Sequence, residues 1–277
     1  MVLDSEKLVV NEDILLEYKQ GKKYFVSLDS SFADAEFALS NVFRFKSSVM
    51  KNLRKSKDLD KRLVAFMDLI DNTMSFELLT PEKMRLSSRG TPDIIEASGK
   101  NLPSFIKKMS PAQKESFMKK IKWIMNGRID DIDAETKGQP GWTQIKIEEK
   151  YIERNIFISS KEMSDGVLRL IAFVAISEIQ TSKAVYLLDE IENGINMAYV
   201  EKLTKLFSDM VANTKSQVIL TTHSTFFMDY FDPESILLLY RTETGETCTD
   251  KPFDNADLRE QLEYMFPGEI ILNMNNK

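Results

Sequence analysis

Three polar residues that could do chemistry follow short apolar runs in the C-terminal half of the chain. Asp189 and Glu190 come directly after Val185–Leu188, and His223, the single histidine, follows the run that begins at Val218. An aspartate in this place suits Mg²⁺, which proteins usually hold through one or two carboxylates and the phosphates of a substrate. A neighbouring glutamate can polarise an attacking water, and a histidine can hydrogen-bond a terminal phosphate. Taken singly, however, each feature is better explained by a helix cap or a structural histidine.

A further candidate is the sequence Ser164-Asp165-Gly166, which opens an apolar helical pattern over 167–179. Ser164 or Asp165 is a good N-cap, and Gly166 leaves backbone N–H groups uncovered at the positive end of the helix dipole. A helix start of this kind can bind an anion. In isolation, an ordinary helix cap explains the same residues.

The alternation of strand and helix patterns predicts how these residues are positioned. Apolar runs at 185–188, 218–222 and 236–240 are typical of strands buried on both faces. Helical patterns lie before and between them, over 167–179 and 197–210. This order predicts an α/β fold with a parallel sheet covered by helices, in which ligands bind at the carboxyl ends of the strands. The polar residues at the strand ends are therefore expected on one rim of the sheet.

The N-terminal half has a different pattern. It begins with three short strands, a turn at Gly21 between the last two of them, and a helical periodicity from about Phe32. Residues 76–100, with two prolines and two glycines, indicate an irregular connection. The predicted strands are 7–10, 14–18, 24–28, 129–135 and 142–148, and the further helices are 63–70, 102–109 and 111–125.

A group of basic residues lies between two of the predicted helices. A solvated helix face or loop is the ordinary explanation, and contact with phosphate is the alternative. Its members are Lys51, Arg54, Lys55, Lys57, Lys61 and Arg62.

Composition excludes several classes of protein. The 277 residues carry 37 basic and 43 acidic side chains, a net charge of −6, which excludes a globally basic nucleic-acid coat. The single cysteine, Cys248, excludes a disulfide framework, and the single histidine excludes two-histidine mechanisms and most zinc enzymes. The N-terminus does not resemble a signal peptide, and the apolar runs are too short to cross a bilayer. A cytoplasmic protein without membrane contact is expected.

In combination, the order and spacing of these motifs resemble those of the ATP-binding cassette ATPases, in the soluble branch with RecF, SMC and OLD-type proteins, often described as "AAA domain" proteins. Ser164-Asp165-Gly166, followed by Leu168-Arg169, resembles the signature motif, and residues 185–190 resemble Walker B. Residues 192–195 resemble the D-loop, and residues 221–224 resemble the switch-histidine loop. The resemblance is close over 157–241 and general elsewhere.

This resemblance implies a function. It implies ATP and Mg²⁺ as ligands, Asp189 as a metal ligand, Glu190 as the catalytic carboxylate and His223 as a contact of the γ-phosphate. It also implies a head-to-tail dimer that sandwiches ATP. Ser164, Asp165 and Gly166 would then reach the nucleotide held by the partner, with Asn193 and Gly194 at the shared interface. DNA maintenance or phage defence is the implied setting, with DNA or a separate nuclease as a further partner.

One family motif has no counterpart in the sequence. None of the ten glycines begins or ends a Gly-x-x-x-x-Gly-Lys-Ser/Thr phosphate loop, or P-loop, since neither Gly21-Lys22 nor Gly99-Lys100 fits it. We expect the chain to be the C-terminal part of a longer ATPase that works with a P-loop-bearing segment or partner. The alternative is a pseudo-ATPase, a regulatory or interaction module without hydrolysis. Gln144 and Gln180 are weak candidates for the family's Q-loop glutamine.

These observations predict four regions. Residues 1–30 would supply antiparallel strands of the ATPase core, and residues 31–128 a mainly helical lobe. Residues 129–250 would hold the core with its motifs, and residues 251–277 a C-terminal helix and tail. The expected fold is P-loop NTPase-like, without the P-loop segment itself.

Overall fold

The computed structural model describes residues 5–19, 24–26, 35–37, 59–76, 80–136, 138 and 140–275. By their internal contacts these residues form two compact units, Met1–Thr73 and Met74–Lys277. The functional division expected at 30, 128 and 250 stays a prediction.

The N-terminal unit contains an antiparallel sheet with the strand order β1-β2-β3-β4. The strands are Ser5–Val10, Asp13–Lys19, Tyr24–Val26 and Ala35–Phe37. The first three strands confirm the predicted pattern. The fourth corrects the helix expected from Phe32, because these residues pair with β3 and cross-strand pairing overrides the local periodicity. The rest of that predicted helix, and the turn at Gly21, lie outside the described residues.

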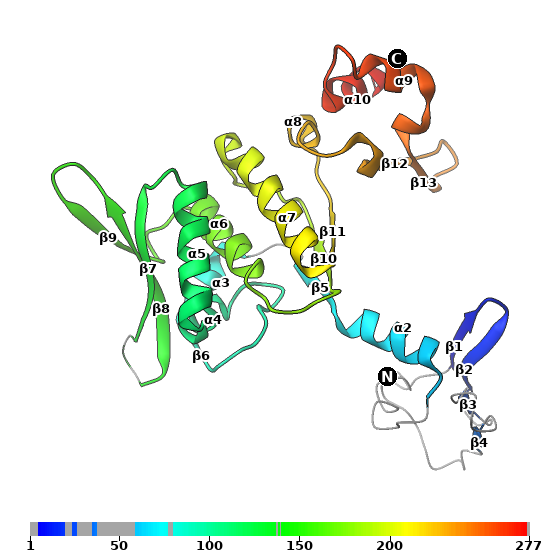
Figure 1. The fold of residues 1–277 in the computed structure, drawn as a ribbon, viewed down its shortest axis with the longest axis horizontal. Helices are drawn as coiled ribbons and strands as arrows, with labels where there is room; N and C mark the ends of the chain where they lie inside the picture. Colours follow the sequence, from blue (N-terminus) through cyan, green and yellow to red (C-terminus); the bar gives the residue numbers. More distant parts are fainter. Residues whose placement is uncertain are drawn as a thin grey trace. The chain divides into compact units, whose positions relative to one another are not determined.

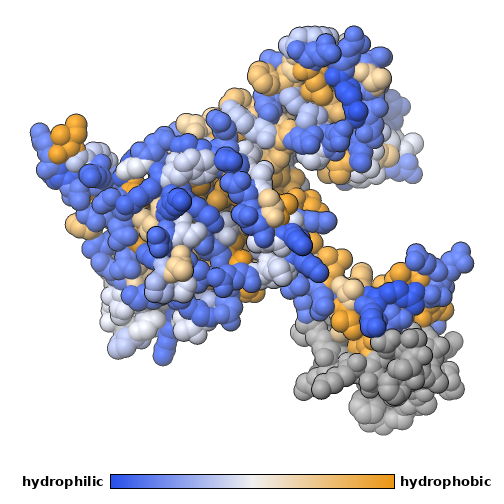
Figure 2. Space-filling model, viewed as in Figure 1, coloured by the Kyte–Doolittle hydropathy of each residue, from blue (hydrophilic) through white to orange (hydrophobic). Residues whose placement is uncertain are grey.

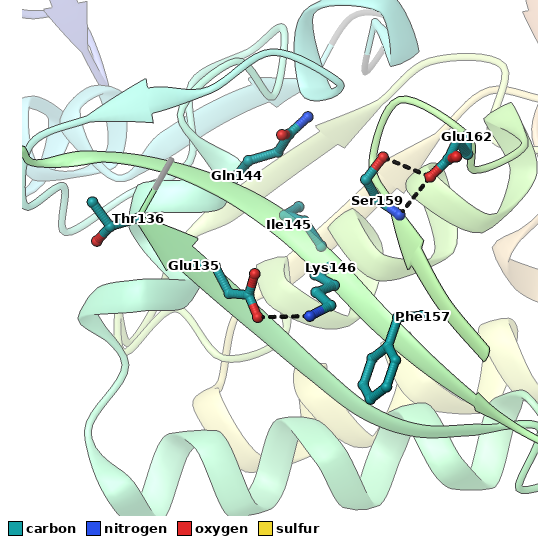
Figure 3. A pocket seen from close by; sticks show the side chains of 8 residues that line it. All are labelled: Glu135, Thr136, Gln144, Ile145, Lys146, Phe157, Ser159 and Glu162. Carbon is teal, nitrogen blue, oxygen red and sulfur yellow. Dashed lines mark hydrogen bonds and ion pairs between the residues drawn. The ribbon is translucent and has the colours of Figure 1, made fainter. Parts of the chain in front are cut away.

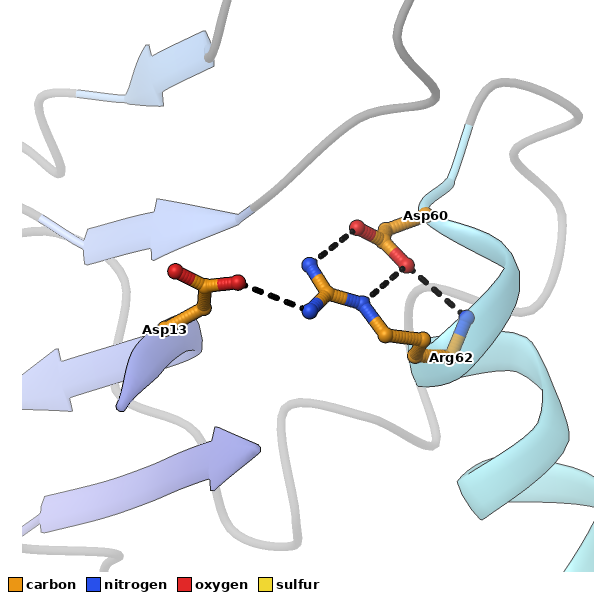
Figure 4. Close-up of polar contacts among 3 residues, drawn as sticks. All are labelled: Asp13, Asp60 and Arg62. Carbon is orange, nitrogen blue, oxygen red and sulfur yellow. Dashed lines mark hydrogen bonds and ion pairs between the residues drawn. The ribbon is translucent and has the colours of Figure 1, made fainter. Parts of the chain in front are cut away.

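Helix α2 (Lys61–Asp71) confirms the predicted helix in this unit and begins at a charge cluster. The Asp60 carboxylate accepts the Arg62 N–H at 2.8 Å, and the Arg62 guanidinium donates to Asp60 at 3.0 Å and to Asp13 at 2.8 Å (Figure 4). The hydrogen bonds that Arg62 donates to Asp60 and Asp13 raise the pKa of its guanidinium. Both carboxylates compete with any phosphate for this guanidinium. Outside the described residues lie Lys51, Arg54, Lys55 and Lys57.

The larger unit begins with an antiparallel sheet covered by helices. β6, β8 and β7 lie in this order, and β9 also pairs with β8. Figure 1 shows α5 beside this sheet, and α6 packs against α5 on the same side of the sheet. A capping box between Ser110 and Gln113 fixes the start of α5. The elements are α3 (Pro81–Met84), β6 (Ser88–Arg89), α4 (Leu102–Lys108), α5 (Pro111–Ile124), β7 (Ile129–Thr136), β8 (Trp142–Lys150) and β9 (Asn155–Ser159).

A second sheet holds the strand ends that the motifs follow. Its order in the described residues is β11-β10-β5, and β10 and β11 are parallel, with Leu188 opposite Leu220. A short 3₁₀ helix (Met197–Tyr199) leads into the helix that connects β10 to β11, as predicted for a strand–helix–strand unit. The elements are β5 (Thr73–Phe76), β10 (Val185–Leu188), α7 (Val200–Thr214) and β11 (Gln217–Leu220).

The core of this unit is centred on α6 (Asp165–Ile176), whose residues from Leu170 to Ile176 are all buried. A helix that is apolar on every side must be enclosed on every side. The surrounding elements supply the partners, and Phe173 meets the Phe207 ring of α7 edge to face. Figure 2 shows a largely hydrophilic outer surface around this part of the molecule. Burial also raises the pKa of the Tyr186 hydroxyl in β10.

The end of the chain forms a small subassembly with its own apolar cluster. β12 (Leu238–Arg241) pairs antiparallel with β13 (Thr247–Asp250), so the prediction that 236–240 forms a buried strand of the parallel sheet is wrong. Only alternate residues of this run face the small cluster, and Leu237 and Leu239 are exposed. Around it lie α8 (Thr225–Met228), two 3₁₀ turns (Pro233–Ser235 and Pro252–Asp254), α9 (Ala256–Gln261) and α10 (Pro267–Asn275).

Candidate functional site

The ends of β10 and β11 bring four residues together: Asp189, Glu190, Thr221 and His223, here termed the strand-end cluster. The Thr221 hydroxyl donates to Asp189 Oδ1 and accepts the Glu190 N–H at 2.9 Å. The backbone continues the strand pairing, since the Thr221 N–H donates to the Leu188 carbonyl at 2.9 Å. The parallel register therefore places both strand ends on one rim, as the sequence predicts.

The two candidate catalytic side chains lie on the outside of this cluster. His223 Nε2 is 3.9 Å from Glu190 Oε1, and the side chains are 89% and 40% exposed. The Asn193 amide donates to the other Glu190 oxygen at 2.5 Å. Glu190 has a φ of +43°, a left-handed conformation that a glutamate adopts at a cost. The cluster thus presents a carboxylate and an imidazole to solvent from a fixed backbone.

The sequence Ser164-Asp165-Gly166 forms the start of α6. Ser164 is the N-cap, and its hydroxyl accepts the Val167 N–H at 3.4 Å. A Cβ added at Gly166 would lie 2.2 Å from the Gly194 carbonyl oxygen. The expected openness of Gly166 is therefore only partial, because the loop 190–195 packs against this side of it. The same loop contacts the strand-end cluster, so it connects the two groups of predicted site residues.

Sequence patterns did not identify Arg85, which holds this helix start in place. Its guanidinium donates to Asp165 Oδ1 at 2.5 Å and to the Met163 carbonyl at 2.8 Å. Its own carbonyl accepts the Ser160 hydroxyl at 2.9 Å and the Gln144 amide at 3.2 Å. Arg85 is distant from the motif in sequence and has no characteristic neighbours, so no local signal indicated this role.

Gln144 lies in a cavity of about 420 Å³ on the face of β7, β8 and β9 (Figure 3). The polar groups around this cavity are paired with one another: Lys146 with Glu135 at 2.9 Å, and Ser159 with Glu162 at 2.8 Å. Lys146 also lies over the Phe157 ring, 4.4 Å from its centroid. Gln144 itself is buried and bonded to Arg85 and Ser160. The other Q-loop candidate, Gln180, lines a separate cavity beside α4.

The strand-end cluster offers few protein ligands to a metal ion. In the described residues no group of three His, Cys, Asp or Glu side chains could hold a metal ion. Asp189 and the Thr221 hydroxyl provide only oxygen atoms, which Mg²⁺ prefers, and Mg²⁺ commonly takes its other ligands from water and phosphate. The donor set fits a magnesium ion that arrives with a phosphate ligand, and it does not fit a metal held by protein alone.

Comparison with known protein families places this arrangement in one of them. A family model described as "AAA domain, putative AbiEii toxin, Type IV TA system" matches residues 22–229. The chain belongs to this AAA-domain family. Its fold is accordingly the α/β, P-loop NTPase-like fold, and the domain is of the ATPase type. The described residues contain no helix with the length and apolarity of a membrane span.

One curated relative is an "ATP/GTP phosphatase" of Helicobacter pylori, 28% identical over 133 residues. The match covers 46% of this chain and 35% of the relative, so the chain spans about a third of that protein's length. Among solved structures, the similarity to the SMC head domain from Thermotoga maritima covers 88% of this chain and 71% of that domain's chain. The two are 14% identical in sequence, with a TM-score of 0.39. The similarity to a structure from a study of "ATP-driven dimerization and DNA stimulated activation of SMC ATPases" covers 50% of this chain and 84% of the other chain, with 19% identity and a TM-score of 0.38.

Proposed function

We propose that this chain is the motif-bearing lobe of an ATPase and hydrolyses ATP when a P-loop-bearing segment or partner supplies the remaining phosphate contacts. The observation that carries the proposal is the strand-end cluster, in which Asp189, Glu190, Thr221 and His223 lie on one rim. Membership in the AAA-domain family supports it.

Each side chain of the cluster has a role that its position supports. Asp189, oriented by the Thr221 hydroxyl, would hold Mg²⁺, and the ion would neutralise charge on the phosphates. Glu190, held by the Asn193 amide, would orient the attacking water. His223, exposed beside Glu190, would hydrogen-bond the terminal phosphate.

The start of α6 supports the dimer part of the proposal. Ser164 and Gly166 would contact a nucleotide held by a second copy or by a P-loop-bearing partner, with Asn193 and Gly194 at the interface. The packing of Gly194 on Gly166 favours this grouping, because both residues would move as one body. Asp165 would lie near the phosphates, with the negative charge of its carboxylate balanced by the Arg85 guanidinium.

The matching family supports a proposal for the biological setting, since it is described as a putative AbiEii toxin of a type IV toxin–antitoxin system. We propose phage defence or DNA maintenance as the setting, in the cytoplasm, with DNA or a separate nuclease as a further partner.

The Glu190→Gln variant tests the proposed chemistry. Together with a P-loop-bearing chain, it should lose about 10²–10⁴-fold in ATP hydrolysis, because glutamine keeps the shape but cannot act on water as a base. ATP-dependent association, followed by analytical ultracentrifugation, should remain. Glu263→Gln, an exposed glutamate near the C-terminus, is the control and should hydrolyse ATP like the wild type. Unchanged turnover in Glu190→Gln would assign the catalytic role elsewhere.

A non-hydrolysing interaction module is the second candidate, because the 277 residues contain no P-loop sequence. Both candidates share one expectation for the isolated chain: without backbone amides around the β-phosphate, binding of MgATP should be weak or undetectable by calorimetry. Micromolar affinity of the purified monomer would contradict it. Hydrolysis in the presence of a P-loop-bearing chain separates the two candidates.

A further inference from the structure

Glu192 lies in the loop after β10 but faces the neighbouring loop. Its Oε1 atom accepts the backbone N–H of His223 at 2.7 Å. Its Oε2 atom is buried and, in the part of the chain that the structure describes, has no hydrogen-bond partner. A buried, half-paired carboxylate costs stability, so packing alone does not explain a glutamate here.

The backbone around Glu192 is held on both sides. Ile191 and Ile195 are buried, with 1% and 8% of their surface exposed. The Ile191 N–H donates to the Thr221 carbonyl at 3.3 Å, and the Glu192 carbonyl accepts the Ile195 N–H at 3.0 Å. Since the loop is anchored at Ile191 and Ile195, the backbone position of Glu192 is fixed.

His223, in contrast, has little to hold it. Its imidazole is 89% exposed, so packing cannot fix where the ring lies. The Thr222 hydroxyl before it accepts the Ser224 N–H at 3.0 Å, but this bond lies within the loop itself. The backbone is next tied to a neighbouring strand at Thr221, whose N–H is paired with Leu188. The Ser224 hydroxyl after it caps α8. The bond to Glu192 therefore fixes the backbone of His223, whose imidazole lies 3.9 Å from Glu190.

We propose that Glu192 is a positioning residue that ties the His223 loop to the loop after β10 and so keeps the imidazole beside Glu190. The effect on hydrolysis rests on the proposed function, but the hydrogen bond between the Glu192 carboxylate and the His223 backbone does not. Glu192 would act through His223 and not on the nucleotide, because its Oε1 atom is bonded to the His223 backbone and its Oε2 atom is buried.

Amide hydrogen exchange on the chain, followed by mass spectrometry at a concentration too low for self-association, tests the hydrogen bond between Glu192 and His223 without any nucleotide. In the wild type the His223 amide should be protected although it lies in a loop. Glu192→Ala should speed its exchange by roughly 10-fold or more, the loss expected for a hydrogen bond to a charged acceptor. Glu192→Gln, which keeps an acceptor oxygen, should stay within about threefold of the wild type. Amides of Tyr186 in β10 and Ile219 in β11 should be unchanged in both variants.

Two outcomes would overturn the proposal. An unprotected His223 amide in the wild type would do so even if Glu192→Ala failed to fold. Equal acceleration at His223, Tyr186 and Ile219 would show a general loss of stability in place of a local tie.

The kinetic consequence is measured with a P-loop-bearing chain. Glu192→Ala should lower kcat about 10–100-fold with KM within about threefold, and Glu192→Gln should restore most of it. If the wild type does not hydrolyse ATP, the proposed function is contradicted. The hydrogen-exchange result then tests the hydrogen bond between Glu192 and His223 by itself. Hydrolysis by Glu192→Ala at the wild-type rate would contradict the role of Glu192 alone.

Discussion

At the scale of single residues, backbone geometry and short polar contacts place the groups of the strand-end cluster. Glu190 has a φ of +43°, a conformation that costs about 1–2 kcal/mol for a residue with a Cβ. The Thr221 hydroxyl, which accepts the Glu190 N–H, offsets part of this cost. Strain of this kind persists only where its surroundings fix it, and it is common at functional sites.

The pair formed by Arg85 and Asp165 gives a prediction at this scale. Their side chains are 23% and 56% exposed, so solvent weakens their attraction. A double-mutant cycle with Arg85→Ala and Asp165→Ala, measured by urea unfolding, should give a coupling of about 0.5–1 kcal/mol that falls with added salt. The exposed pair of Lys100 and Glu96 is the control and should couple by less than about 0.5 kcal/mol. Equal coupling energies in the two pairs would mean that Arg85 stabilises the start of α6 no more than an ordinary surface ion pair would.

At the scale of elements, α6 links the two sheets and begins at the candidate site. Its body is buried on all sides, so its position is fixed by packing. Its first turn lies between the side chain of Arg85 and the carbonyl of Gly194. A rigid helix therefore carries Ser164 to the place where the loop 190–195 packs.

Gly166→Ala tests this packing. In an open helix the change from glycine to alanine adds about 1 kcal/mol of stability. Here the new Cβ would lie 2.2 Å from the Gly194 oxygen, so the free energy of unfolding should fall by about 1–3 kcal/mol.

Gly194→Ala is the comparison for this prediction. Its Cβ would meet no atom closer than 3.9 Å, and only its φ of +72° makes it costly, by about 1 kcal/mol. Thermal unfolding of both variants checks the prediction. A stabilised Gly166→Ala protein would contradict the contact between the start of α6 and the loop 190–195.

At the scale of the whole molecule, the sheet edge determines how the chain behaves alone. In the described residues β11 ends the order β11-β10-β5, and Ile219 is 56% exposed on it. None of the four residues of β11 is charged. An uncharged, exposed edge invites pairing with another strand.

We predict that the isolated chain is poorly soluble or self-associates through β11. Ile219→Lys should shift it toward monomer in sedimentation velocity, because a charged side chain on an edge strand opposes pairing. Ile152→Lys removes an isoleucine that is more exposed than Ile219, from the connection between β8 and β9, and should leave the association unchanged. Co-expression with a P-loop-bearing strand should yield a stable complex. A monodisperse wild type with slow amide exchange in β11 would contradict the prediction.

The sequence alone determined those features that depend on local pattern. The period of apolar residues predicted α5, α6, β10 and β11, and the types of Ser164 and Asp165 predicted an N-cap at one of these two residues, because capping and periodicity act within a few residues. The structure assigns the N-cap to Ser164. The shared rim of Asp189 and His223 also followed, since parallel strands end at the same edge.

Only the tertiary structure decided features that depend on distant partners. The run 236–240 is as apolar as β10, yet it pairs with β13, because the choice of partner strand depends on chain segments that no local window includes. Arg85 and Glu192 have ordinary neighbours in the sequence, and their roles arise from contacts with Asp165 and His223 across the fold. Local propensity fixes an element, but long-range packing and hydrogen bonding fix what that element meets.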